Sequence, residues 1–391
     1  MKKAKACWGR PEYVASMQHG RKIGTRRNLR RSKFIWLFSA SDSGIVSAVF
    51  GTVGRNIRGR WGEASVDKSV EIDSAVPVAE YSEAPDVSLR NPSRANASRE
   101  FLDDSDYILR AWAVILTLAA IDWLWARHAG IEISGMMRAV EGVAIFAVFA
   151  FLVDYTGRVP QVAEAAHYVA LWISFAVALV IYSYVVATLR MPLRDVEFAR
   201  MDAALGFNWS AGFDWVMTSS SMTRYILEHA YNSMMVQVFA SIAFFVVIKR
   251  SDRNRELLWI GMLSVLICVS LSGPFPALGP FTKGGMPSWS AVLLTIRDGS
   301  ATKFTLDHLN GIVAFPSCHA VTAIVLVYVH RPPLRSFVPV AILNVLMLLA
   351  TPFAGHHYLV DLLSGAAVVA ISIPIVHAAM RPRSLARLER A

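Results

Sequence analysis

A succession of apolar runs fills the chain from Tyr107 onward and constrains the fold more than any other feature. A helix that crosses a bilayer needs roughly 20 apolar residues, and its backbone must bond within the segment because hydrocarbon offers no partner. The runs predict an all-α, polytopic membrane helical bundle with about six to eight transmembrane helices. The expected helices cover 107–126, 138–156, 166–188, 231–249, 256–273, 317–330, 336–353 and 358–380.

Composition and charge agree with a membrane protein. Of the 391 residues, 54% are hydrophobic and 17% are charged, and 39 basic against 29 acidic residues give a net charge of +10. The basic residues gather in the N-terminal tail and in short loops, which indicates membrane orientation rather than a nucleic-acid partner. The three cysteines are too few and too scattered for a disulfide framework or a metal site, and we expect neither a metal nor another cofactor.

Three short basic segments predict the orientation: 249–255, 330–335 and the tail after 380. The positive-inside rule places all three in the cytoplasm. Alternation of the spans then places 274–316 and 351–357 on the extracytoplasmic side. We therefore expect a multi-pass protein of the cell's inner or plasma membrane with both termini cytoplasmic.

The chain is expected to have three parts. Residues 1–105 are basic, then acidic and rich in serine and proline, which predicts a disordered cytoplasmic tail. Residues 106–190 hold the N-terminal transmembrane helices, and 191–391 form a second membrane domain. The connection 190–230 mixes arginines, carboxylates and aromatic residues, so it is either an interfacial helix along the membrane or a folded surface loop.

The sequence Pro316-Ser317-Cys318-His319 stands at the start of an apolar run. Proline suits the first turn of a helix, and the free amides of the next three residues would attract phosphate there. Ser317 adds a hydroxyl donor, and His319 titrates near neutral pH. The alternative is an ordinary helix cap with a histidine that has no chemical role.

A second motif, Gly355-His356-His357-Tyr358-Leu359-Val360-Asp361, begins the last apolar run. His357 and Asp361 are four positions apart, so on a helix they share a face. A carboxylate bonded to one ring nitrogen fixes the tautomer and leaves the other as base or nucleophile. The alternative is a salt bridge at a helix end. His356 points about 100° away on a helix, and is either structural or substrate-facing.

Together the two motifs resemble the type-2 phosphatidic acid phosphatase superfamily of membrane lipid phosphatases and phosphotransferases. That family carries a Pro-Ser-Gly-His box and a Ser-Arg-x5-His-x3-Asp box on consecutive helices. Cys318 replaces the glycine, and the expected Ser-Arg pair falls on Ala350 and Thr351, so the phosphate-binding arginine is missing. The resemblance covers about 200–391 and makes 191–391 a catalytic phosphatase or phosphotransferase-like domain.

Three details are more similar to the branch that contains inositol phosphorylceramide synthases. These are the form of the second box, the Pro-Ala-Leu-Gly-Pro sequence at 276–280, and Asp202-x3-Gly206-Phe207, to which no role is assigned. The family's Lys-x6-Arg-Pro box is not recognisable. Arg297 is our choice for a phosphate clamp because its fork matches phosphate oxygens, and Lys283 is a second basic candidate. The alternative for Arg297 is an interfacial arginine that faces lipid head groups.

The resemblance implies the role of each site residue. His357 attacks phosphorus and forms a phosphohistidine, Asp361 orients it, and His319 protonates the leaving group. Ser317 and the adjacent amide of Cys318 hold the phosphoryl oxygens. Cationic and helix-end donors can stabilise the charge without a metal.

The expected function is that of a membrane lipid phosphatase or phosphotransferase at the extracytoplasmic face. Its substrate would be a phospholipid or polyprenyl phosphate. Transfer of an inositol phosphate head group to a lipid acceptor remains open, because both reactions share the phosphoenzyme. A lipid-binding or transporting protein without catalysis is the alternative of another class, and Asp122 and Glu141 in the first runs would fit a transporter. The oligomeric state stays open.

Overall fold

The computed structural model describes residues 94–156, 159–281, 285–306 and 311–380, all within the unit Ser88–Ala391. These residues form 12 helices and two short strands. The helices are α2 Arg94–Ala129, α3 Met136–Thr156, α4 Pro160–Ala187, α5 Asp195–Ala204, α6 Trp209–Thr218, α7 Ser221–Asn232, α8 Met234–Val247, α9 Ser251–Ser272, α10 Ser288–Asp298, α11 Cys318–Val329, α12 Phe337–Ala354 and α13 Leu359–Met380. The tail predicted for 1–105 lies outside the described residues up to position 93, and α2 begins at Arg94.

Five of the described helices are long and apolar enough to cross a membrane: α2 from Asp106, α4, α9, α12 and α13. The pair α7 and α8, bent by 57° at Ser233, would make a sixth span. The all-helical membrane fold is thus confirmed with five or six candidate spans rather than eight. Each of the eight predicted runs contains a helix, but α11 has only 12 residues and α3 is not among the five.

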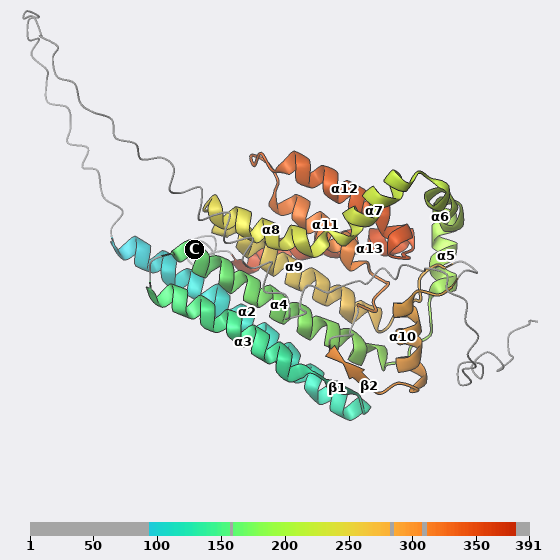
Figure 1. Cartoon of the computed structure of the whole chain (residues 1–391), viewed down its shortest axis with the longest axis horizontal. Coiled ribbons are helices and arrows are strands. Elements are labelled where there is room, and N and C mark those ends of the chain that lie inside the picture. The colour runs from blue at the N-terminus through green and yellow to red at the C-terminus, as the bar shows by residue number, and fades with distance from the viewer. Residues whose placement is uncertain (1–93, 157–158, 282–284, 307–310, 381–391) are drawn as a thin grey trace, which may run out of the picture. The chain divides into compact units, whose positions relative to one another are not determined.

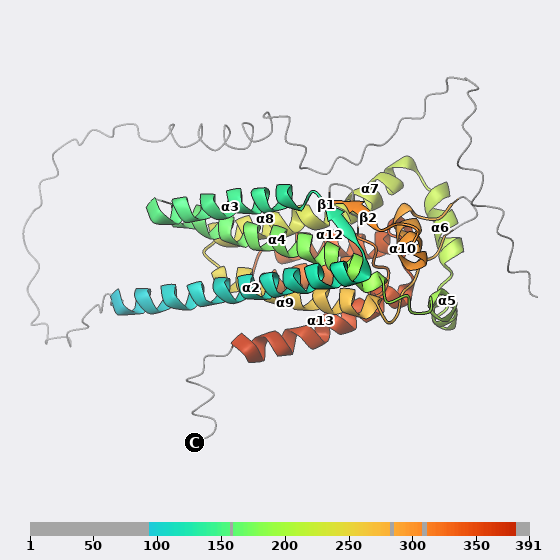
Figure 2. The ribbon, with the colours of Figure 1, turned by 90° about the horizontal axis from the view of Figure 1, so that it is seen from below.

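The long helices run side by side as a bundle (Figures 1 and 2). One apolar cluster joins residues of α2, α4, α8, α9, α11 and α13, among them Ile115, Phe175, Phe245, Leu257 and Leu326. The N-terminal helices therefore share a core with the C-terminal ones. Two three-residue strands, β1 (Glu132–Ser134) and β2 (Lys303–Thr305), pair in parallel and join the end of α2 to the segment after α10.

The outer face of α12 shows how the bundle meets lipid. Asn344, Met347 and Thr351 are fully buried on its inner side. Large apolar side chains are exposed on the other side at helical spacing: Val338, Ile342, Val345 and Leu349. A polar residue turned inward with apolar residues outward is the distribution expected of a helix surrounded by hydrocarbon.

The connection 190–230 forms three short helices, α5, α6 and α7, at one end of the bundle (Figure 1). Asn208 and Ser220 cap α6 and α7 by accepting the amides of Ala211 and Thr223. Large apolar side chains of α6 and α7 are exposed, including Trp215, Met217, Met222 and Tyr225. This surface favours interfacial helices over a surface loop.

The loops fall into two groups at opposite ends of the bundle. At one end, Glu256 bonds to Arg331 at 2.8 Å and to Arg253 at 3.0 Å, and His377 lies 3.7 Å away. These contacts bring together two of the three basic segments that charge alone placed on one side, 249–255 and 330–335, and the last turn of α13; the tail after 380 lies outside the described residues. At the other end, the Ser317 amide donates to the Asp361 carbonyl at 3.0 Å, which joins the two histidine motifs.

Candidate active site

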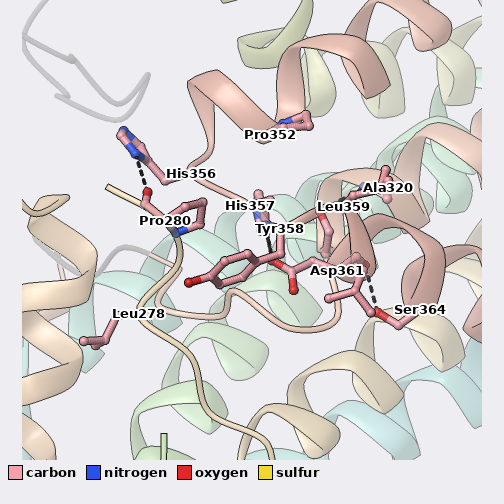
Figure 3. Close-up of polar contacts among 12 residues, drawn as sticks. Leu278, Pro280, Ala320, Pro352, His356, His357, Tyr358, Leu359, Asp361 and Ser364 are labelled. Carbon is pink, nitrogen blue, oxygen red and sulfur yellow. Dashed lines mark hydrogen bonds and ion pairs between the residues drawn. The ribbon is translucent and has the colours of Figure 1, made fainter. Parts of the chain in front are cut away.

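The turn between α12 and α13 carries the second histidine motif. His356 adopts a left-handed backbone with φ 56° and turns the chain into α13. His357 Nδ1 then lies 3.2 Å from Asp361 Oδ2 (Figure 3). The predicted contact is present, but its geometry differs from the one expected, because His357 precedes α13 instead of lying on its face.

The Asp361 side chain also caps the start of its own helix, α13. Its Oδ2 also accepts the Tyr358 amide at 2.9 Å, the return contact of a capping box. Asp361 is fully buried and His357 is 4% exposed. With Nδ1 turned to the carboxylate, Nε2 is the nitrogen of His357 left for chemistry. The second oxygen of Asp361 has no partner among the described residues.

Asp202 on α5 completes this helix start from a distant part of the chain. Its two carboxylate oxygens accept the amides of Leu359 at 2.8 Å and Val360 at 3.0 Å. Tyr358, at the cap position, has no short polar side chain that could do so. Burial raises the pKa of Asp202, and the two amide bonds oppose that rise. Burial of this carboxylate costs free energy, and the two amides that it accepts at the start of α13 explain why it lies there.

Asp195 lies seven positions before Asp202 on α5 and connects the 276–280 loop to the start of α13. Its carboxylate accepts the Leu278 amide at 3.0 and 3.1 Å and the Tyr358 hydroxyl at 3.2 Å. Burial raises the pKa of Asp195, while the bonds from Leu278 and Tyr358 lower it. Helix α5 therefore fixes both the 276–280 loop and the residue next to His357.

His356 packs against this loop and away from the other histidines. Its Nδ1 lies 3.1 Å from the Pro280 carbonyl (Figure 3), and its ring lies 5.8 Å from that of Trp209. The His356 carbonyl approaches Gly279 so closely that no side chain fits there, and Gly279 has φ +74°. Burial lowers the pKa of His356. These contacts correspond to the structural role, one of the two considered for His356.

Ser317 caps α11, and this corrects the expected position of the proline. The Ser317 hydroxyl accepts the Ala320 amide at 3.3 Å, so Pro316 precedes the cap instead of occupying the first turn. The Ser317 amide is not free, since it donates to the Asp361 carbonyl. The amides of Cys318 and His319 come next in α11, and no acceptor for them is found in the described part of the chain.

His319 stands opposite His357. The two ring centroids are 6.4 Å apart and the rings are inclined by 59°. Tyr231, from α7, stacks on the other side of His319 with centroids 4.0 Å apart and an angle of 15°. A phosphoryl group that contacts both histidines would have the free α11 amides within the same site, which suits stabilisation of a developing negative charge.

The structure does not bring every predicted residue to this site. The side chain of Cys318, the first residue of α11, is half-buried against the apolar core, so only its amide belongs to the site. Arg297, on α10, donates to the Met191 carbonyl, and no contact with either histidine is found for it among the described residues. Lys283 lies outside the described residues. No group of three His, Cys, Asp or Glu side chains placed to hold a metal occurs in the described ranges.

Sequence reasoning missed Tyr231 and Asp195 as members of this arrangement. Asp202 was noted as part of a pattern, but its role came only from the fold. Tyr231 and Asp195 lie more than a hundred residues before His357 and carry no local pattern that would point to it. Only their tertiary positions reveal them.

A scan of protein-family models gives a match over residues 196–375. This segment matches the PAP2 superfamily. Members of the PAP2 superfamily are typically phosphatases or phosphotransferases, and the match confirms the family-level resemblance of the motifs over this segment. It begins within α5 and ends within α13, so both histidine motifs and Asp202 fall inside it. Comparison with curated proteins and with solved structures found no match.

Proposed function

We propose that this chain is an integral membrane enzyme that cleaves a phosphate ester of a lipid through a phosphohistidine on His357. The observation that carries the proposal is the contact of His357 Nδ1 with the buried Asp361, together with His319 across a 6.4 Å gap between ring centroids. The PAP2 match makes phosphoester chemistry the expected class. The position of the site at the end of apolar helices supports a lipid as the substrate.

The reaction would proceed in two halves. His357 Nε2 attacks phosphorus while its Nδ1–H is held by Asp361, and the bond from phosphorus to the leaving oxygen breaks. His319 gives its proton to that oxygen, and Ser317 with the first α11 amides holds the phosphoryl oxygens. Water, or the hydroxyl of an acceptor such as a lipid alcohol, then attacks the phosphorus of the phosphohistidine. His319 takes the proton of the attacking group, and the nitrogen–phosphorus bond breaks.

Trapping the phosphohistidine tests this mechanism. Purified protein in detergent would be given labelled phosphatidate, polyprenyl pyrophosphate, phosphatidylinositol or lipid A, and acid-labile, base-stable label on the protein would be measured. We expect label on the wild type and none on His357→Ala. His229→Ala, which changes an exposed histidine of α7, serves as the matched control. Full turnover by His357→Ala would exclude the nucleophile assigned here.

The same preparation separates the three classes of function. Discharge of the labelled enzyme by water identifies a phosphatase, and discharge only by the hydroxyl of a lipid acceptor or another alcohol identifies a transferase. Lipid binding without label or release of phosphate in any lipid would identify a binding or transport protein. Arg297→Ala measures the expected clamp, and unchanged activity in that variant removes Arg297 from the site.

We further propose that the histidines face the extracytoplasmic side and that both termini are cytoplasmic. The basic segments 249–255 and 330–335 support this orientation because they meet at the opposite end of the bundle. Single cysteines placed in exposed loop positions of each end, on a cysteine-free background, would be labelled with an impermeant reagent in intact cells. Labelling of the 249–255 loop instead of the 274–280 side would reverse the orientation.

A further inference from the structure

Tyr231 occupies a position that the two histidine motifs do not explain. It lies in the last turn of α7, just before the bend into α8, and its ring lies nearly parallel to that of His319. Stacking of this kind restricts the imidazole to one orientation. Because the ring of His357 lies 6.4 Å from that of His319, this contact bears on how His319 is oriented relative to the nucleophile.

The hydroxyl of Tyr231 and the imidazole of His357 both approach Gly355. The Tyr231 oxygen and the His357 Cδ2 atom each come within 2.7 Å of the point where a Cβ of Gly355 would stand. Cδ2 adjoins Nε2 in the imidazole ring, and Nε2 is the nitrogen left free by Asp361. No hydrogen-bond partner is found for the Tyr231 hydroxyl among the described residues, although a phenol can donate one.

The described part of the site lacks the cation that a phosphoryl group ordinarily meets. Thr351, at the position of the missing arginine, is fully buried and donates its hydroxyl to the Met347 carbonyl. Arg297 is bonded to the Met191 carbonyl instead. The Tyr231 hydroxyl is therefore a neutral donor close to both histidines, where a charged one is absent.

We propose that Tyr231 is a further catalytic residue of this site. Its hydroxyl donates a hydrogen bond to a non-bridging phosphoryl oxygen as His357 Nε2 attacks, and its ring holds His319 in position to give up its proton. The proposal rests on the phosphoryl-transfer function proposed above. It requires no covalent change at Tyr231, because the phenol keeps its proton throughout.

Tyr231→Phe isolates the hydroxyl, since phenylalanine keeps the stacked ring. Removal of one donor to a developing oxyanion lowers turnover by about 100- to 1000-fold where the donor is well placed. Because Ser317 and the first α11 amides would hold the same phosphoryl group, the loss of one donor should cost less, and we expect kcat to fall about 10- to 100-fold, with KM little changed. Tyr231→Leu removes the ring as well and should lower kcat further.

Tyr225→Phe is the matched control. Tyr225 lies on the same helix and also stacks on a histidine, His229, with centroids 3.7 Å apart. It is 56% exposed, so loss of its hydroxyl should leave turnover and binding unchanged. An equal effect of the two substitutions would show that α7 tolerates no change and would overturn the role proposed for Tyr231.

Binding of orthovanadate supplies a readout that does not need turnover, because vanadate takes the five-coordinate geometry of phosphorus under attack. Equilibrium dialysis of the full chain in detergent should show binding by the wild type and about tenfold weaker binding by Tyr231→Phe. If Tyr231→Phe matches the wild type in both kcat and vanadate affinity, this inference is wrong and the proposed function stands.

The remaining outcomes separate the two proposals. A wild type that binds vanadate but acts on none of the lipids refutes the proposed reaction, and the vanadate affinities alone then decide the role of Tyr231. A wild type that neither binds vanadate nor acts on any lipid refutes both. Thermal unfolding of each variant is measured beside these assays, so that loss of fold is not taken for loss of the donor.

Discussion

Replacing Asp202 by alanine removes the acceptor of two amides at the start of α13. The carboxylate bonds the amides of Leu359 and Val360 at 2.8 and 3.0 Å, and it is 3% exposed. An unpaired buried amide costs about 1–3 kcal/mol. Since some water can enter the space left by the carboxylate, we expect the free energy of unfolding to fall by about 2–4 kcal/mol.

The loss should extend to chemistry in the protein that remains folded. His357 lies two positions before Leu359, so a helix start that frays displaces the nucleophile relative to His319. A misplacement of about 1 Å can cost about 100-fold in rate, and we expect kcat of Asp202→Ala to fall by about that factor. Asp202→Asn keeps one accepting oxygen and should lie between the alanine variant and the wild type.

Two measurements check this prediction. Chemical unfolding in mild detergent, followed by tryptophan fluorescence, gives the change in stability, and initial rates with the lipid that labels His357 give kcat. Asp214→Ala, which removes an exposed carboxylate from neighbouring α6, is the control. An Asp202→Ala protein with the unfolding midpoint and kcat of the wild type would refute the argument that α5 holds the nucleophile in place.

Three further predictions concern other contacts. Gly355→Ala should lower kcat at least about tenfold, because its Cβ would stand 2.7 Å from His357 Cδ2. Gly142→Ala, with open space around it, should not, and equal rates for the two variants would contradict this. Because burial lowers the pKa of His356, the folded state favours the neutral imidazole. The stability that neutral His356 contributes is complete above its unfolded pKa of about 6.5 and is lost as pH falls through its folded pKa. The free energy of unfolding, measured from about pH 5 to about pH 8, should therefore vary less with pH in His356→Asn than in the wild type. An unchanged pH dependence would show that another group causes it. Glu256→Gln removes the carboxylate charge shared by Arg253 and Arg331 and should lower the free energy of unfolding by about 3 kcal/mol. It should leave kcat of the folded protein unchanged, because these ion pairs lie at the opposite end of the bundle, and a large fall in kcat would refute that separation.

The sequence predicted the parts of the fold that depend on local pattern. Apolar runs gave a helix at each predicted place, and the four-residue spacing predicted the contact of His357 with Asp361. The grouping of the basic loops at one end also followed from charge. The predicted helix boundaries were less accurate than the helices themselves. Helix α11 begins after its cap Ser317 instead of at it, and residue spacing does not reveal the left-handed turn at His356 before α13.

The parts of the site that depend on distant segments could not be predicted. Asp195 and Asp202 lie on a short helix whose sequence gives no sign of the amides that it meets. Tyr231 reaches His319 only because the helix of α7 and α8 bends by 57° at Ser233. Such contacts arise from tertiary packing, for which a single sequence offers no period or motif.

The hydrogen bond from the Ser317 amide to the Asp361 carbonyl joins the two motifs through main-chain atoms alone. A change of side chain at position 317 or 361 leaves the donating amide and the accepting carbonyl in place. The exception is proline at position 317, because proline has no amide hydrogen. The distance between the two motifs therefore does not depend, through this bond, on which side chains they carry. Ser317→Ala and Asp361→Asn therefore change the cap of a helix while this main-chain link between the motifs remains, and the link is equally compatible with a cysteine at 318.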